Sequence, residues 1–138
     1  MAGNTTPIFT KVGDVQWINT VLAANTTTDL TTGTSYLAFT ADATNGGYVQ
    51  KLRFRALGTN VATVARVWLN NGATTGTAAN NTLFDEVTLA ATTVSQTSAL
   101  SVYEVPVNLA MPPGYKIYIT LGTAVAAGYD VIAVGGKY

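Results

Sequence analysis

Short runs of apolar residues, most of them alternating with polar ones, follow one another along the whole chain. Clusters of Gly, Asn, Thr and Pro separate these runs. A period of two is typical of β-strands that bury one face, and no segment carries the i, i+3, i+4, i+7 apolar stripe of a capped amphipathic helix. The pattern predicts about eight strands, at residues 15–23, 35–40, 47–58, 61–70, 83–89, 100–109, 115–121 and 129–134.

This series of strands indicates the fold class and the domain organisation. An all-β chain of about eight antiparallel strands suits a single β-sandwich of the jelly-roll type. The chain has 138 residues, which is enough for one domain with a core of its own. We expect residues 15–138 to form this domain. Residues 1–14 are expected to form an N-terminal arm that packs on a neighbouring molecule, with Ile8 and Phe9 as candidate contacts.

Turn-forming residues support the strand boundaries. Asn70-Asn71-Gly72 ends one strand with residues that tolerate positive φ, and Pro112-Pro113-Gly114 forces a turn before another strand. Gly58-Thr59-Asn60 is the shortest joint in the chain, and it predicts a β-hairpin over residues 47–70. Pro106 cannot donate a hydrogen bond to a neighbouring strand, which predicts that it lies on an edge strand or at a bulge.

The alternation also assigns strand faces, because successive side chains of a strand point to opposite sides of the sheet. In residues 115–121 this predicts two sets of side chains. The set expected in the core is Tyr115, Ile117, Ile119 and Leu121, and the set expected to point away from it is Lys116, Tyr118 and Thr120.

Composition narrows the range of partners. Charged residues make up 10% of the chain, and seven basic side chains balance seven acidic ones. Zero net charge favours self-association, which predicts a homo-oligomer. Binding to nucleic acid is not expected, because it draws on clustered cations. A membrane span is not expected either, and the first residues lack the features of a signal peptide, so we expect a protein made in a cytoplasm and not exported by the secretory route.

The residue types also argue against catalysis. The chain has no His and no Cys, which removes the usual general base and the usual ligands of transition metals. Asp85 and Glu86 are adjacent in a predicted strand, so they face opposite sides of a sheet and do not form a catalytic acid pair. Calcium near Asp29 or Asp42 is a weak alternative, since no spacing resembles an EF-hand loop. We expect a protein that is not an enzyme, without catalytic residues, metal or cofactor.

One concentration of charge stands out. Lys51, Arg53 and Arg55 alternate with apolar residues, so three cations are expected along one face of a sheet. This stripe is either a solvated surface, on which acidic side chains of adjacent strands reduce the repulsion between the cations, or an interface that pairs with carboxylates of a partner. Arg66 and Trp68 share a face of the next strand and are candidates to join either arrangement.

Aromatic residues offer a second kind of contact, since exposed rings stack on sugars. Strand positions favour packing inside the molecule for most of them. Tyr118 is the exception, because alternation turns it away from the core, and it is a candidate interface residue. The aromatic residues considered are Trp17, Tyr36, Tyr48, Trp68, Tyr118 and Tyr129.

Four segments carry a resemblance to a known group of proteins. They read GYVQKLRFRALGTN at 47–60, RVWLNNG at 66–72, LFDEVTL at 83–89 and PPGY at 112–115. With these segments the chain resembles small virion structural proteins of tailed bacteriophages and prophages. The resemblance covers most of the chain and marks a scaffold, so it carries over no catalytic residue.

The resemblance implies a function for the whole chain. It implies a capsid decoration (cement) protein on the capsid surface of the virion. Such a protein would bind the major capsid protein, commonly as a homotrimer, and reinforce the head shell. The alternative is a receptor- or carbohydrate-binding module of a tail or head fibre, for which the long loops rich in Thr, Asn and Gly are the motivation.

Overall fold

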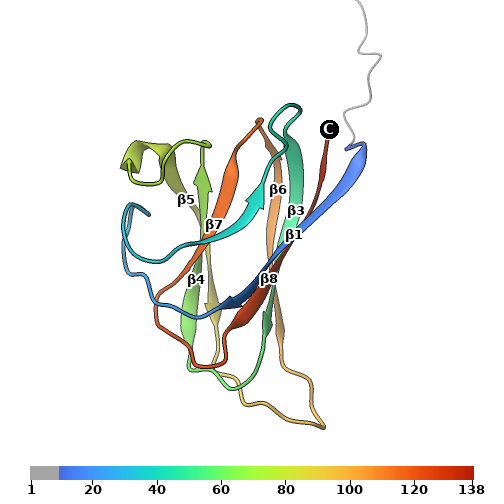
Figure 1. The fold of residues 1–138 in the computed structure, drawn as a ribbon. Coiled ribbons are helices and arrows are strands. Elements are labelled where there is room, and N and C mark those ends of the chain that lie inside the picture. Colours follow the sequence, from blue (N-terminus) through green and yellow to red (C-terminus); the bar gives the residue numbers. More distant parts are fainter. Residues whose placement is uncertain (1–9) are drawn as a thin grey trace, which may run out of the picture.

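The computed structural model of the chain describes residues 10–138. Eight strands form two four-stranded antiparallel sheets that pack face to face, so the chain is an all-β sandwich (Figure 1). Within the described range the one helical element is a 3-10 turn, η1 (Ala78–Asn80). The strands are β1 (Val12–Val21), β2 (Tyr36–Thr40), β3 (Gly47–Ala56), β4 (Thr63–Asn70), β5 (Asn81–Leu89), β6 (Val102–Met111), β7 (Lys116–Leu121) and β8 (Tyr129–Lys137).

All the strands expected from the sequence are present, and the predicted fold class is confirmed. The largest differences in strand bounds lie at the start of β1 and the end of β8. These two ends pair with each other, since Val12 lies opposite Lys137 and Asp14 opposite Gly135. Residues 12–14 therefore belong to the sheet and not to an arm. Ile8 and Phe9 lie outside the described residues.

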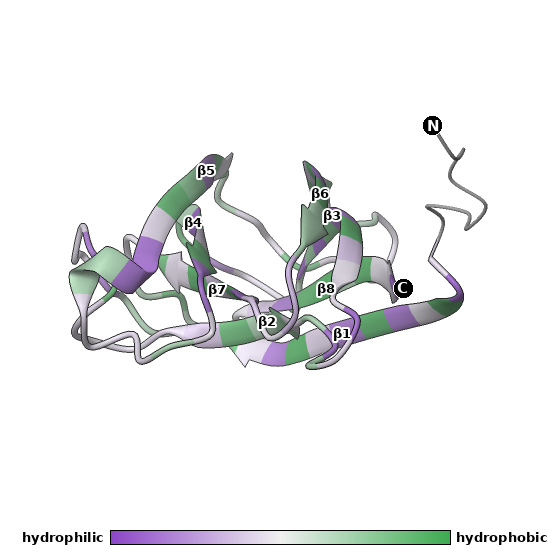
Figure 2. Cartoon of the chain, turned by 90° about the horizontal axis from the view of Figure 1, so that it is seen from above, coloured by the Kyte–Doolittle hydropathy of each residue, from purple (hydrophilic) through white to green (hydrophobic). Residues whose placement is uncertain are grey.

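The order of the strands is that of a jelly roll. The first sheet has the order β1-β8-β3-β6 and the second has the order β2-β7-β4-β5. The pairs are nested, with β4 next to β5, β3 next to β6, β2 next to β7 and β1 next to β8. One long hairpin folded over on itself produces this arrangement, and its two Greek keys define the jelly roll. Figure 2 shows the two sheets as separate layers.

The expected hairpin over residues 47–70 is wrong. β3 pairs with β6 and β8 in the first sheet, whereas β4 pairs with β5 and β7 in the second. Asn60, in the joint between them, is buried and holds the crossing in place. Its side chain accepts hydrogen bonds from the N–H groups of Ala127 and Gly128 and donates one to the carbonyl of Gly128. A short joint specifies a turn, but not the strand with which the next strand pairs.

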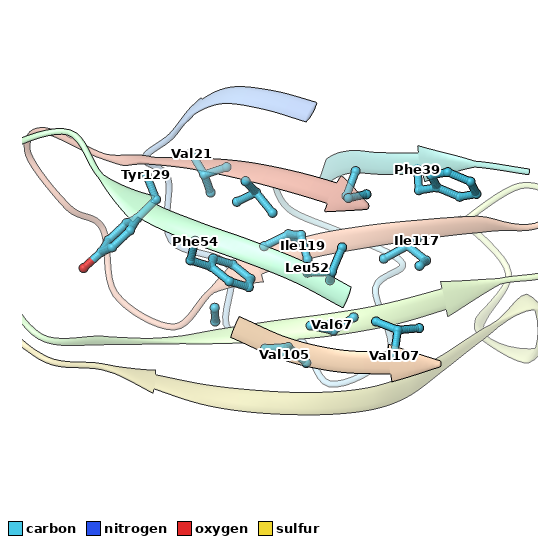
Figure 3. Close-up of a cluster of buried hydrophobic side chains, with 14 of the residues drawn as sticks. Val21, Phe39, Leu52, Phe54, Val67, Val105, Val107, Ile117, Ile119 and Tyr129 are labelled. Carbon is cyan, nitrogen blue, oxygen red and sulfur yellow. The ribbon is translucent and has the colours of Figure 1, made fainter. Parts of the chain in front are cut away.

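The hydrophobic core lies between the two sheets (Figure 3). Side chains of both inner faces interdigitate there, as the alternation predicts. In β7 the expected core face is confirmed, because Ile117, Ile119 and Leu121 are fully buried. Tyr115, just before β7, is partly buried at the border of this core. Thr120 is buried as well, although it points to the opposite side.

Pro106 meets both conditions that the sequence predicted for it. It lies on β6, which is an edge strand of the first sheet. It also lies beside a bulge, because the register between β3 and β6 shifts between the pair Val49–Leu109 and the pair Lys51–Pro106. Asn108 takes a positive φ of 47° in this bulge, a conformation that Asn tolerates better than most residues.

A loop of this chain lies across the outer face of the second sheet. Residues 22–35 connect β1 to β2, and Figure 1 shows them beside the second sheet. Asn25 donates its backbone N–H to the carbonyl of Leu121 at the end of β7, and Asn81 of β5 donates its side-chain N–H to the carbonyl of Asp29. Leu30 in this loop is 2% exposed although it lies outside the main core. The loop therefore gives the second sheet an outer cover.

Candidate binding face

The structure places the predicted interface residues on two opposite surfaces. Lys51, Arg53 and Arg55 lie on the outer face of β3 in the first sheet, as the alternation predicted. Arg66 and Tyr118 lie on the outer face of the second sheet, where Arg66 is opposite Thr120 and Tyr118 is opposite Trp68. The suggestion that Arg66 joins the cation stripe is therefore wrong, because β3 and β4 belong to different sheets.

Register sets the neighbours of the cation stripe across the first sheet. One row runs from Trp17 of β1 through Ile132 and Arg53 to Glu104 of β6. The adjacent row runs from Val15 through Val134 and Lys51 to Pro106. We call this surface the apolar-cationic face, and define it by Val15, Trp17, Lys51, Arg53, Arg55, Ile132 and Val134.

Trp17 is the most exposed large apolar side chain of this face. Its exposed fraction is 63%, and that of Val15, two residues earlier on the same side of β1, is 51%. Ile132 and Val134 of β8 are partly buried beside them. Sequence reasoning took Trp17 for an internal packing residue, and that interpretation is wrong. In β1 both strand faces carry apolar residues, so alternation alone did not show which face lies outside.

The three cations of the face differ in their partners. The Lys51 ammonium forms an ion pair with the Glu104 carboxylate at 3.1 Å across β3 and β6. The Arg55 guanidinium donates a hydrogen bond of 3.1 Å to the carbonyl of Leu100. Arg53 is exposed and makes neither an ion pair nor a side-chain hydrogen bond with any residue from 10 to 138. The Glu104 carboxylate thus offsets the positive charge of Lys51, while the Arg53 guanidinium is free to bind solvent or a partner.

A shallow hollow lies at the β6 side of this face. It has a volume of about 160 Å³ and is lined by Gln50, Lys51, Glu104, Pro106 and Asn108 at the bulge. Its size suits one side chain of a partner rather than a drug-sized ligand, which needs at least about 300 Å³. The hollow therefore gives this part of the face a concave shape.

The outer face of the second sheet is chemically different. Arg66 donates from Nε to the Glu86 carboxylate at 3.0 Å, and Trp68 donates its indole N–H to the Thr120 hydroxyl at 2.9 Å. Trp68 is only 2% exposed, and Tyr118 beside it is partly buried. The indole of Trp68 is therefore satisfied within the chain, whereas Nη1 of Arg66 is buried without a hydrogen-bond partner among the described residues.

A second hollow, of about 210 Å³, lies where β4 and β5 meet the η1 turn. Amide side chains line it, which would suit a sugar, but these amides are bonded to one another and to the backbone. Asn70 donates to Asn81, Asn71 donates to Asn80, and Asn80 donates to the carbonyl of Thr74. Their hydrogen bonds hold the 71–80 loop, so little capacity is left for a glycan.

Acidic side chains are the candidate metal ligands of the described residues, because the chain has no His and no Cys. Residues 10–138 contain no cluster of three or more His, Cys, Asp or Glu side chains that could hold a metal ion. Asp29 and Asp42, the carboxylates considered for calcium, accept hydrogen bonds from backbone N–H groups of their own turns, and these bonds lower the pKa of each. No helix in this range is long and apolar enough to cross a membrane.

The chain was compared with models of protein families, with curated protein sequences and with solved structures, and none of them matched.

Proposed function

We propose that this protein is a non-enzymatic structural protein of a bacteriophage virion, which decorates the head shell and reinforces it by binding the major capsid protein. The observation that carries the proposal is the apolar-cationic face. This is a rigid sheet surface on which Trp17 and Val15 are more than half exposed and Arg53 has no partner among residues 10–138. The resemblance of residues 47–60, 66–72, 83–89 and 112–115 to phage virion proteins supports the assignment to a virion.

The composition of this face fits protein contact better than chemistry. Trp and Arg are enriched in interfaces and among the residues that dominate binding energy. Here both side chains are anchored in one row of a four-stranded sheet. A partner that docks on such a surface orders little backbone, so less of the binding free energy is lost to conformational entropy.

The mechanism follows from repetition. Each copy that contacts two capsid subunits adds buried interface across their boundary, and a shell offers many equivalent sites. Weak single contacts become strong when several copies bind together, because the second contact is made at a high effective concentration. The low charge of the chain is consistent with a surface that is largely covered after assembly.

The alternative as a glycan- or receptor-binding fibre module has less support. Its motivation was the loops rich in Thr, Asn and Gly. In the 71–80 loop the Asn side chains are bonded within the chain, and in the 22–35 loop Asn25 donates to the carbonyls of Thr32 and Thr34. These loops are stabilised by their own side chains, so their composition is explained without a ligand.

Addition of the purified protein to phage shells that lack it tests the proposal. Co-sedimentation should show saturable binding at a copy number of the order of that of the capsid subunits, and the decorated shells should release DNA at a higher temperature. Trp17→Ser should weaken binding by roughly 30-fold, the effect of losing a central aromatic anchor. Leu37→Ser, which changes an exposed apolar residue of β2 on the other sheet, is the control and should bind normally. Absence of wild-type binding, or shells of unchanged heat resistance, would contradict the proposal.

A further inference from the structure

The apolar-cationic face has a chemical counterpart on the other sheet of the same molecule. β5 is an edge strand of the second sheet and carries a bulge, because its register with β4 shifts between the pair Val67–Asp85 and the pair Trp68–Leu83. Leu83 and Phe84 are 44% and 36% exposed there, and Asp85 is exposed beside them. We call Leu83, Phe84 and Asp85 the β5 bulge.

The two surfaces carry charges of opposite sign that form no ion pair within the described part of the chain. On the apolar-cationic face Lys51 is paired with Glu104, Arg55 is bonded to the carbonyl of Leu100, and Arg53 has neither an ion pair nor a side-chain hydrogen bond within residues 10–138. On β5, Glu86 is paired with Arg66. Asp85 forms no ion pair within residues 10–138, and its carboxylate accepts a hydrogen bond from the backbone N–H of the next residue. Each surface therefore has one ion pair, and Arg53 on the first surface and Asp85 on the second are charges of opposite sign outside these pairs.

The apolar parts of the two surfaces match as well. Arg53 shares its row with Ile132 and Trp17, while Asp85 follows Phe84 directly in the chain. An aromatic side chain thus lies near the unpaired charge on each surface. On the apolar-cationic face Arg53 and Trp17 are two strand spacings apart, about 10 Å, with Ile132 between them. A bulge also disrupts the row of backbone hydrogen-bonding groups along an edge strand, so we expect contact there to be made through side chains.

We infer that the β5 bulge of a second copy of this chain docks on the apolar-cationic face, with Asp85 of one copy paired to Arg53 of the other and Phe84 packed against Trp17. The inference rests on the proposed function and deepens it, because copies joined through this face would bind the shell as a group, and Trp17→Ser would then weaken shell binding through loss of that group. The two surfaces differ and lie on different sheets, so the contact is heterologous. Heterologous contacts close into rings when the rotation between copies permits, and a ring is the form in which several copies meet the shell together.

Charge reversal tests this pairing. Arg53→Glu and Asp85→Arg should each weaken self-association by about tenfold or more, because like charges then meet across the interface. The double variant R53E/D85R should recover most of the loss, since the pair is restored with its signs exchanged. Association is measured by native mass spectrometry and by sedimentation velocity over a dilution series. Lys116→Glu, which reverses a cation on the other sheet, is the control and should associate as the wild type does.

Two further variants separate the pairing from folding effects. Arg53→Gln removes the cation without adding an acid opposite Glu104, and it should still weaken association. Phe84→Ser should weaken association as Trp17→Ser does. Each variant should keep the wild-type melting temperature in the dilute, monomeric form. A wild-type protein that is monomeric at every concentration overturns the inference, as does an oligomer that is insensitive to R53E and D85R or a double variant without recovery.

The two proposals fail in different ways. Self-association is measured without shells, and shell binding is measured by co-sedimentation. A monomer that still binds shells would overturn the inference and leave the proposed function intact. An oligomer that depends on Arg53 and Asp85 but does not bind shells would support the inference and contradict the proposed function.

Discussion

The outer faces of the two sheets present the same kind of side chain in opposite states. Trp68 lies on the outer face of the second sheet and is 2% exposed, and its indole N–H is bonded to Thr120. Trp17 lies on the outer face of the first sheet and is 63% exposed. The loop of residues 22–35 is bonded to the second sheet at Leu121 and at Asn81, and Leu30 in this loop is buried. The first sheet is left open, with its hydrophobic side chains beside a cation stripe.

This difference shows which of the two outer faces is covered by a segment of the same chain. Covering such a sheet face costs conformational entropy, because the covering loop must be ordered. Here Asn25 and Asp29 supply the hydrogen bonds that fix the loop of residues 22–35. No described segment is bonded across the outer face of the first sheet in the same way. Its apolar area is therefore available to another molecule, and comparison of the two faces by mutation tests this view.

The largest effect is expected from removal of the two tryptophans one at a time. Trp68→Ala should lower the free energy of unfolding by about 3–5 kcal/mol, because it leaves a cavity under the loop and removes the partner of Thr120. Trp17→Ala should change it by about 0.5 kcal/mol or less, as expected for an exposed side chain. Urea unfolding of both variants measures the difference. Equal losses of stability would show that the first face is also part of the folded core.

The next effect concerns the loop of residues 22–35, which we expect to cover Trp68. Asn25 is 4% exposed, and its side chain bonds to the carbonyls of Thr32 and Thr34 and accepts hydrogen bonds from Thr27. Asn25→Ala should cost about 1–3 kcal/mol, because buried polar groups of the loop lose their partners. In a Trp17→Phe background the emission of Trp68 should shift to the red and become accessible to acrylamide.

Asn19→Ala is the control for this loop. Asn19 is an exposed residue of β1, and its side chain forms no hydrogen bond with residues 10–138, so neither stability nor emission should change. If Asn25→Ala left the Trp68 emission unchanged, some other segment would have to cover this tryptophan.

A smaller effect is expected from the two ion pairs, one on each face. Glu104→Gln on the open face should change stability by about 0.5 kcal/mol or less, and high salt should abolish the difference. Glu86→Gln should cost more, up to about 1 kcal/mol, because Arg66 is then left without its carboxylate while its Nη1 is buried without a hydrogen bond. Urea unfolding at low and high salt compares the two, and a larger loss for Glu104→Gln would reverse the expected order.

The sequence was sufficient to predict the strands and their inner faces, because these depend on local alternation. Ile117, Ile119 and Leu121 are buried as predicted, and Lys51, Arg53 and Arg55 share a face. It was not sufficient to predict strand pairing. The joint at Gly58-Thr59-Asn60 looked like a hairpin, but the contacts of Asn60 with Gly128 and Thr92 that make it a crossing are far apart in the sequence.

The same limit applies to the candidate binding face. Neither the exposure of Trp17 nor the burial of Trp68 follows from strand alternation, since both side chains lie on outer faces. Their difference arises from the path of the 22–35 loop, which is fixed by the hydrogen bond from Asn81 to the carbonyl of Asp29 and by the contact of Asn25 with Leu121. Tyr118 points away from the core as predicted, but it is partly buried on the outer face.

The smallest effect is expected from acid, and it again separates the two faces. The Asp29 carboxylate accepts hydrogen bonds from the backbone N–H and the hydroxyl of Thr31, and these bonds hold its pKa below the ordinary value of 3.8. A carboxyl group with a depressed pKa in the folded state stabilises the fold above its unfolded-state pKa, and this contribution is lost as the pH falls through the folded-state value. The covering loop should therefore loosen below about pH 3.8.

Asp29→Asn keeps the shape and an acceptor oxygen but does not titrate, so the variant should lose part of this response to acid. In the Trp17→Phe background, the emission of Trp68 should then change less on acidification than it does with Asp29 present. Asp42→Asn is the matched control, because the backbone N–H groups of Asn45 and Thr44 lower the pKa of Asp42 in the same way, but in a turn away from this loop. It should leave the acid response of Trp68 unchanged. If both variants altered that response equally, acid would act on the whole sandwich, and the covered face would not owe its cover to Asp29.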